Sequence, residues 1–367
     1  KKENPAAKIV VTGCAAQVST ERFAEMPEVD IVLGNKEKTE IEKYLVSDRK
    51  TVVGDIFSFS GYDAYMITGF EGRERAFVEI QQGCNHRCTY CIVSYARGAN
   101  RSVPEEKIMA QIALLLQQGF KEICLTGIDA CSYEPSFSGL VAAVLKRFPD
   151  LPSLQFGSLD PAAINDEFIE LVRNYPNIYP HFHFSVQSGD NLILKRMGRR
   201  HSREDVISLC GRLREVRPEC TFGADFICGF PTETDENFAN TLKLVEEAGI
   251  DKLHVFPYSE RPGTPAARML NRVDTAEAER RAELVVDVQS RIMDDFNDSR
   301  MGTVAEVLCD GFDQEAMQFV GRSYAESPDI DGRIYFTADH EVEAGEFVPV
   351  RITGAMDGEL TGELAEE

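Results

Sequence analysis

Six strand-and-helix units follow one another between residues 76 and 269, and this repeat restricts the fold more than any other feature. Each unit begins with a short apolar, β-branched run and a loop, and a segment with helical periodicity follows in the first five. Strands are predicted at residues 76–81, 122–126, 153–157, 181–185, 221–228 and 252–257, and helices at 105–118, 138–148, 166–175, 203–216 and 236–247. Such alternation predicts an α/β fold with a parallel sheet, open or curled into a partial β/α barrel. Functional groups are then expected at the C-terminal ends of the strands.

Shorter segments flank this repeat on both sides. The N-terminal one alternates strands and helices but is too short for a complete α/β domain, and without an initiator methionine we expect the natural start to lie upstream. The charged pattern at 275–300 is typical of one long helix. Five short strands with Gly and Asp turns follow, which predicts a small all-β barrel of the oligonucleotide-binding kind. The expected parts are residues 1–59, 60–272, a linker helix at 273–300, and 301–367.

Cys84, Cys88 and Cys91 have the spacing C-x3-C-x2-C directly after a predicted strand. Three thiolates suit a cluster of four irons and leave one iron open to a ligand with an amino and a carboxylate group, such as S-adenosylmethionine. Zinc is the alternative, but structural zinc needs a fourth ligand, and His86 is the nearby candidate. Tyr90, next to the last cysteine, is a candidate to pack near the adenine of that cofactor.

Polar and glycine residues follow the predicted strands. The candidate cofactor-binding residues among them are Gly127, Asp129, Ser158, Gln187 and Asp225. A carboxylate there can accept a hydrogen bond from an amino group, while hydroxyl and amide groups suit a ribose or a carboxylate. Arg261, after the last strand, is a candidate substrate-binding residue. Each residue alone is consistent with ordinary turn chemistry, so the recurrence at six strand ends is the stronger indication.

The net charge of -22 is unfavourable for nucleic-acid binding, because phosphates need basic partners. Residues 298–367 hold 17 Asp and Glu against 4 Arg and no Lys, which indicates either a solvated acidic surface or a basic partner. In the basic run at 195–203, Arg199 and Arg200 either hold substrate phosphates or begin a solvated helix. The sequence contains no long apolar run and no signal-peptide pattern, so we expect no membrane span. Ten cysteines, three of them grouped and seven scattered, are typical of reduced thiols in the cytoplasm. We therefore expect a cytoplasmic protein.

These motifs together resemble the methylthiotransferase group of radical S-adenosylmethionine enzymes. The resemblance rests on the cysteine motif, on TGCAAQ at 12–17 and on YARG at 95–98, and it extends through the C-terminal barrel. It implies that the motif cysteines hold a 4Fe-4S cluster that cleaves S-adenosylmethionine to a 5′-deoxyadenosyl radical, with an electron-donor protein as partner. It also implies that Cys14 binds a second, sulfur-carrying cluster, whose other two cysteine ligands are expected upstream of Lys1.

Three hypotheses about function remain. Residues 125–129 and 254–265 are similar to the tRNA threonylcarbamoyladenosine methylthiotransferases, which implies methylthiolation at C2 of that nucleoside in the tRNA anticodon loop. Residues 321–332 are instead similar to the terminal barrel of enzymes that methylthiolate an aspartate of a small-subunit ribosomal protein, and the acidic C-terminus suits that basic partner. The third hypothesis is a non-enzymatic iron-sulfur or zinc module that docks on ribosomes.

Overall fold

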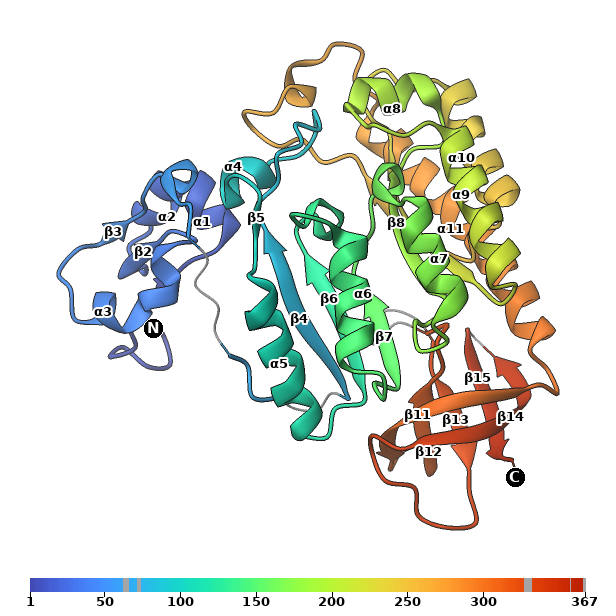
Figure 1. Ribbon diagram of the computed structural model, residues 1–367. Coiled ribbons are helices and arrows are strands. Elements are labelled where there is room, and N and C mark those ends of the chain that lie inside the picture. Colours follow the sequence, from blue (N-terminus) through green and yellow to red (C-terminus); the bar gives the residue numbers. More distant parts are fainter. Residues whose placement is uncertain (62–65, 71–73, 327–331, 357, 366–367) are drawn as a thin grey trace.

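The computed structural model describes residues 1–61, 66–70, 74–326, 332–356 and 358–365. Within these residues the chain forms an N-terminal α/β segment, a half-closed β/α barrel and a closed C-terminal β-barrel (Figure 1). This architecture confirms the predicted fold class. Residues 327–331, part of the stretch that resembles the ribosomal-protein enzymes, lie outside the described residues, and the exact limits between the parts stay a prediction.

The N-terminal segment is a small parallel sheet with three short helices. Its strands pair in the order β1-β2-β3, and Ala16, Val29 and Val32 form its buried core. The elements are β1 (Val10–Val11), α1 (Cys14–Val18), α2 (Thr20–Ala24), β2 (Ile31–Leu33), α3 (Ile41–Leu45) and β3 (Thr51–Val52). Helix α1 packs against α4 (Val93–Arg97), which follows the cysteine motif, so this segment is held beside that motif.

The central sheet is a half-barrel in two parts, with strand orders β5-β4-β6-β7 and β10-β9-β8. A parallel bridge between Leu159 and Phe184 joins the parts. The strands are β4 (Arg75–Gln82), β5 (Arg101–Ser102), β6 (Glu122–Gly127), β7 (Ser153–Phe156), β8 (His181–Gln187), β9 (Thr221–Cys228) and β10 (Lys252–Pro257). All six predicted strands are present, with ends within two residues of the predicted ones, and β5 is the addition.

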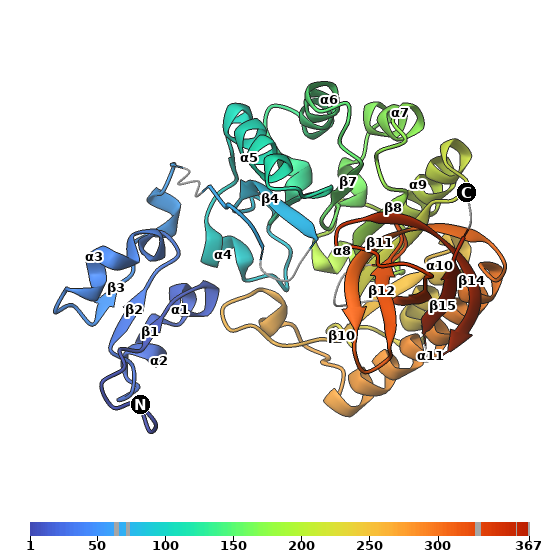
Figure 2. The same cartoon turned by 90° about the horizontal axis from the view of Figure 1, so that it is seen from below.

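Helices cover the outer face of this half-barrel (Figure 2). They are α5 (Glu105–Gln117), α6 (Phe137–Arg147), α7 (Asp166–Asn174), α9 (Arg203–Val216) and α10 (Asp235–Ala248), together with the shorter α8 (Asn191–Met197). In β8, Phe182 and Phe184 belong to the core beneath these helices, while His183 and Ser185 are less buried. Because side chains alternate along a strand, the second pair faces the interior of the half-barrel. Polar groups of β8 therefore point toward the interior.

Helix α11 (Thr275–Ser299) leads into a closed barrel with the strand order β11-β12-β13-β15-β14. The strands are β11 (Val304–Asp313), β12 (Gln318–Arg322), β13 (Ile334–Thr337), β14 (Phe347–Met356) and β15 (Glu359–Leu364). Arg322 donates to Glu122 at the start of β6 at 2.7 Å, and Lys252 at the start of β10 donates to Ala325 O. The small barrel is thus attached to the N-terminal ends of the central strands, opposite the end where functional groups are expected.

Candidate cofactor site and family

The three motif cysteines lie in the loop at the C-terminal end of β4. Gly83 begins this loop with a φ of +73°, and a Cβ there would lie 1.9 Å from the carbonyl oxygen of Ala99. Only glycine tolerates both conditions. Gln81, which is fully buried, donates to the carbonyl of Gly83 at 2.7 Å and accepts from the backbone N–H of Asp129 at 2.8 Å. The loop is therefore anchored both to β4 and to the segment after β6.

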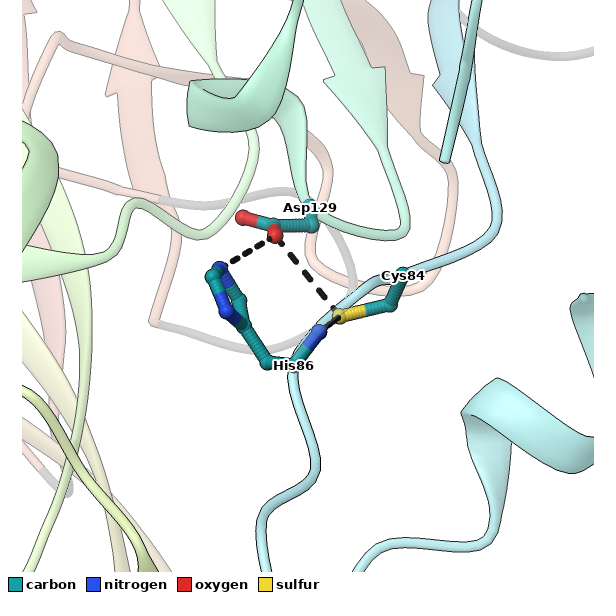
Figure 3. A group of neighbouring side chains, drawn as sticks. All are labelled: Cys84, His86 and Asp129. Atoms are coloured by element: carbon teal, nitrogen blue, oxygen red, sulfur yellow. Dashed lines mark hydrogen bonds and ion pairs between the residues drawn. The ribbon is translucent and has the colours of Figure 1, made fainter. Parts of the chain in front are cut away.

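Asp129 meets the beginning of the cysteine loop, as Figure 3 shows. Its Oδ2 lies 2.9 Å from His86 Nε2 and 3.6 Å from Cys84 Sγ, and it accepts a hydrogen bond from Ser132 Oγ at 2.7 Å. His86, the candidate fourth zinc ligand, is thus engaged by a carboxylate. The predicted role of Asp129 in cofactor binding stays a prediction, but the residue does lie beside a motif cysteine.

Burial affects the protonation of two of the motif thiols, Cys84 and Cys91. It raises the pKa of Cys84 to about 12, and it also raises the pKa of Cys91. The backbone N–H groups of His86 and Val93 donate to these two sulfurs at 3.4 Å each, which favours the thiolate without offsetting burial. Such thiols stay protonated until a metal displaces the proton. This donor set therefore suits a positively charged metal centre.

Potential metal-ligand atoms of the described residues gather at two places in the structure. Among the residues that the structure describes, two sets of three potential ligand atoms gather within 4.8 Å, namely Cys84 with His86 and Asp129, and His183 with Asp225 and His254. The three motif cysteines do not form such a set. A tetrahedral zinc with bonds of about 2.3 Å would hold its sulfurs roughly 3.8 Å apart. The three sulfurs are therefore not arranged as a preformed tetrahedral zinc site.

Arg199 approaches the cysteine loop from the other side. Its side chain is only 8% exposed, and its guanidinium lies 3.8 Å from Cys88 Sγ while donating to the carbonyl of Ser185 at 2.6 Å and to Asp160 at 3.2 Å. Arg200 is 45% exposed and donates to Asp160 at 2.6 Å. Both arginines were predicted to bind a substrate, but they face different surroundings. Arg199 faces the cysteine loop, and Arg200 faces the surface.

The other predicted site residues, apart from Asp225 and Cys14, lie at the same end of the half-barrel as the cysteines. They are Tyr90, Gly127, Ser158, Gln187 and Arg261, which follow β4, β6, β7, β8 and β10 or end them. Tyr90 is half-buried, and burial together with the neighbouring Cys88 raises its pKa. The hydroxyl of Ser158 hydrogen-bonds that of Ser185 at 2.6 Å, and Arg261 is exposed. The fold brings these residues together, and their cofactor and substrate roles stay predictions.

Asp225 lies within β9 rather than at its end, and it contacts two histidines that the sequence analysis missed. Its Oδ1 is 3.0 Å from His183 Nε2 and 3.4 Å from His254 Nδ1. Burial alone would raise the pKa of Asp225, but the hydrogen bonds from these histidines outweigh it and hold the pKa well below its usual range. The sequence feature that could have predicted these contacts is the alternating direction of side chains along β8 and β10, which directs both histidines inward.

Cys14 faces the segment that follows the cysteine motif. Arg97 Nε of α4 lies 3.0 Å from Cys14 Sγ, and Asn35 Nδ2 lies 3.9 Å from it while donating to the carbonyl of Ala96 at 2.8 Å. The thiol is half-buried, and its sulfur faces the guanidinium of Arg97. Its predicted part in a second cluster is compatible with these surroundings and stays a prediction.

Comparison with known proteins agrees with this geometry. The profile of the Radical SAM superfamily matches residues 78–245, and that of the TRAM domain matches residues 301–365. The threonylcarbamoyladenosine tRNA methylthiotransferase MtaB of Aquifex aeolicus is 36% identical over 319 residues, covering 84% of this chain and 77% of that enzyme. The chain belongs to the radical S-adenosylmethionine methylthiotransferase family. Its cofactors are therefore a 4Fe-4S cluster and S-adenosylmethionine, as predicted from the cysteine spacing.

Two further members of the methylthiotransferase family are similar to this chain. MtaB of Rickettsia prowazekii is 50% identical over 275 residues, which cover 73% of this chain but 65% of that enzyme. The ribosomal protein uS12 methylthiotransferase RimO of Clostridium botulinum is 32% identical over 381 residues, covering 100% of this chain and 84% of that enzyme. None of the described helices combines the length and the apolar character that a bilayer span requires.

Proposed function

We propose that this chain adds a methylthio group to C2 of N6-threonylcarbamoyladenosine, next to the anticodon of tRNA. The observation that carries the proposal is the 50% identity to the Rickettsia enzyme, whose name specifies threonylcarbamoyladenosine of tRNA. The closed five-stranded barrel at the C-terminus gives further support, because small barrels of this kind bind oligonucleotides.

In this proposal Cys84, Cys88 and Cys91 hold the 4Fe-4S cluster. When bound, the cluster supplies the electron that cleaves S-adenosylmethionine. The surrounding residues keep the ligands in position, since Gln81 and Gly83 fix the course of the loop. The guanidinium of Arg199 at 3.8 Å from Cys88 Sγ offsets the negative charge that the thiolates acquire when they bind metal. We therefore assign Arg199 to the cluster and not to the substrate.

The remaining polar residues receive the two substrates. Asp129 stands beside Cys84 and is assigned to the amino group of S-adenosylmethionine, from which its carboxylate can accept a hydrogen bond. Gly127, Ser158 and Gln187 sit at the ends of adjacent strands and are assigned to S-adenosylmethionine with Tyr90. Arg200 and Arg261 are exposed cations at the same end of the half-barrel and are assigned to tRNA phosphates. Cys14 is assigned to the second cluster.

Mass spectrometry of tRNA nucleosides tests this function. We expect 2-methylthio-N6-threonylcarbamoyladenosine in cells that carry the gene and only the unmodified nucleoside in cells without it. Purified full-length protein, reconstituted anaerobically with iron and sulfide, should transfer labelled methyl to tRNA. Label that appears only on a ribosomal protein would defeat the assignment.

The second candidate is methylthiolation of an aspartate in a small-subunit ribosomal protein, with that protein as partner. It is supported by the similarity to the Clostridium enzyme over the whole chain and by exposed acidic residues on the small barrel, among them Glu315, Asp339, Glu341 and Glu343. Replacing these four residues by their amides separates the candidates. A basic protein substrate would bind more weakly to the variant, whereas tRNA would bind equally or more tightly.

A further inference from the structure

A second constellation of potential metal ligands lies inside the half-barrel, apart from the cysteine loop. His183, Asp225 and His254 come from the adjacent strands β8, β9 and β10. Asp225 and His254 are direct partners in the β9–β10 register, and His183 pairs with Gly223 one row below. The cysteine loop and Asp129 follow β4 and β6, in the other part of the sheet. The three residues are thus held by paired backbone and not by loops.

The donor atoms of this triad converge on one point. The two histidine nitrogens approach the same carboxylate oxygen of Asp225, at 3.0 Å for His183 Nε2 and 3.4 Å for His254 Nδ1. All three donor atoms lie within 4.8 Å of one another. Neighbouring ligands of an octahedral ion with bonds of about 2.1 Å are separated by roughly 3 Å. Little rearrangement is therefore needed to place one ion between the three atoms.

Gly223 makes room for this arrangement. A Cβ at that position would lie 2.5 Å from His183 Nδ1, so the imidazole lies against bare backbone. The rings of His183 and His254 stack with centroids 4.6 Å apart and planes 30° apart, which leaves each ring little freedom to turn. The ligand atoms are held in place before any ion arrives, which lowers the cost of binding.

Two features distinguish the triad from an ordinary buried ion pair. Both imidazole nitrogens approach the same oxygen, Oδ1 of Asp225, so the three donor atoms surround one centre instead of forming a single pair. The side chains also remain 17%, 22% and 27% exposed for His183, Asp225 and His254. Solvent therefore reaches the triad from the interior, where an ion would find its remaining ligands.

We propose that His183, Asp225 and His254 bind a divalent first-row transition ion inside the half-barrel, separate from the cluster cysteines. Two imidazoles and one carboxylate on one side of an ion, with the other positions open, suit Mn²⁺, Fe²⁺ or Zn²⁺. The open positions would take water or an anionic oxygen of a molecule in the half-barrel. The site does not depend on which substrate is methylthiolated.

Titration with Mn²⁺ tests the proposal, because this hard ion competes poorly for thiolates. The full chain with its cluster in the oxidised, EPR-silent state is titrated, and free Mn²⁺ is followed by its EPR signal. We expect one tight site per chain in the wild type, with affinity reduced at least tenfold in Asp225→Asn and His183→Ala. His340→Ala is the matched control, since His340 lies 2.8 Å from Asp339 on the surface and no third potential ligand joins them among the described residues.

A second measurement keeps the proposal falsifiable if a variant fails to fold. Pulsed EPR on the wild-type protein with bound Mn²⁺ should detect coupling to imidazole nitrogen. Bound Mn²⁺ without nitrogen coupling would overturn the proposal, because the acidic surface alone would then explain the binding. Equal affinities in the wild type and Asp225→Asn, with both proteins folded, would also overturn it.

Discussion

Arg322 of the C-terminal barrel forms a buried ion pair with Glu122 of the half-barrel, 200 residues earlier in the chain, at 2.7 Å. Both side chains are nearly inaccessible to solvent, and Arg75 donates to the other oxygen of Glu122 at 2.9 Å. Burial alone would raise the pKa of Glu122, but the charges of Arg75 and Arg322 outweigh it and keep the pKa lowered. The two barrels are thus joined by a buried charge network, in which Arg75 is a second partner of Glu122 and Asp310 of the small barrel a second partner of Arg322.

Removing the arginine should therefore destabilise the chain. We expect Arg322→Met to lower the free energy of unfolding by about 3 kcal/mol, because a buried carboxylate loses a charged partner. Urea denaturation measures this. Arg351→Met, at an exposed arginine that donates to the carbonyl of Gly302 at 3.3 Å, is the control and should stay within about 0.5 kcal/mol. Equal stabilities of the two variants would contradict the importance of this network.

The backbone of Gly83 lies very close to that of Ala99, so substitution of this glycine should be far more destabilising than substitution of a glycine in open space. Gly83→Ala places a Cβ against the backbone of Ala99, so we expect loss of more than about 4 kcal/mol and failure to retain iron. Gly119→Ala has a similar φ of +94° but no atom within 4 Å of its Cβ, and it should cost only about 1 kcal/mol. Iron content and thermal unfolding distinguish the two. Normal iron content in Gly83→Ala would show that the close approach of Gly83 to Ala99 is not needed to hold the cysteine loop.

Asp129→Asn should reduce reductive cleavage of S-adenosylmethionine by roughly 10–100-fold, the usual effect of removing a group that orients a metal site. The amide keeps the shape but loses the charge that holds His86 at 2.9 Å. The measurement is 5′-deoxyadenosine formed per cluster, with iron content as an internal standard. The exposed Asp150→Asn is the control and should leave cleavage unchanged. An unaltered rate in Asp129→Asn would remove this residue from the site.

The neighbouring arginines offer a matched pair. Arg199→Met should lower iron retention several-fold, because the cation 3.8 Å from Cys88 Sγ and its bonds to Ser185 and Asp160 are lost together. Arg200→Met removes one partly exposed contact to Asp160 and should retain iron. Iron and sulfide analysis after gel filtration tests both. Equal iron retention in the two variants would contradict a role of Arg199 at the cluster and favour its predicted role in substrate binding.

Alkylation of the cluster-free protein should follow the raised pKa of Cys84. A thiol with a pKa of about 12 is almost fully protonated at pH 8, so its reaction with iodoacetamide should be slow. Its rate should rise about tenfold per pH unit and still be rising above pH 9, where an ordinary thiol with a pKa near 8.5 levels off. Site-resolved mass spectrometry follows this residue. A plateau at pH 9 would show that burial does not protect the thiol.

Local sequence patterns predicted most of the fold. The six central strands and α11 were predicted from apolar runs and helical periodicity, which depend on neighbours in the sequence. The short helices α1, α4 and α8 were missed. Helix α8 depends on Asp190, whose side chain accepts from the N–H groups of Leu192 and Ile193, and seven residues carry little periodicity.

The sequence by itself determined the element order and predicted the cluster ligands, because periodicity and the C-x3-C-x2-C spacing are local properties. Only the tertiary structure decided which distant side chains meet. Strand register brought Asp225 to His183 and His254, the loop crossing brought Asp129 to Cys84, and barrel docking brought Arg322 to Glu122. The physical reason is that register and docking are set by the packing of the whole chain, and a shift of one residue would turn each side chain to the opposite face.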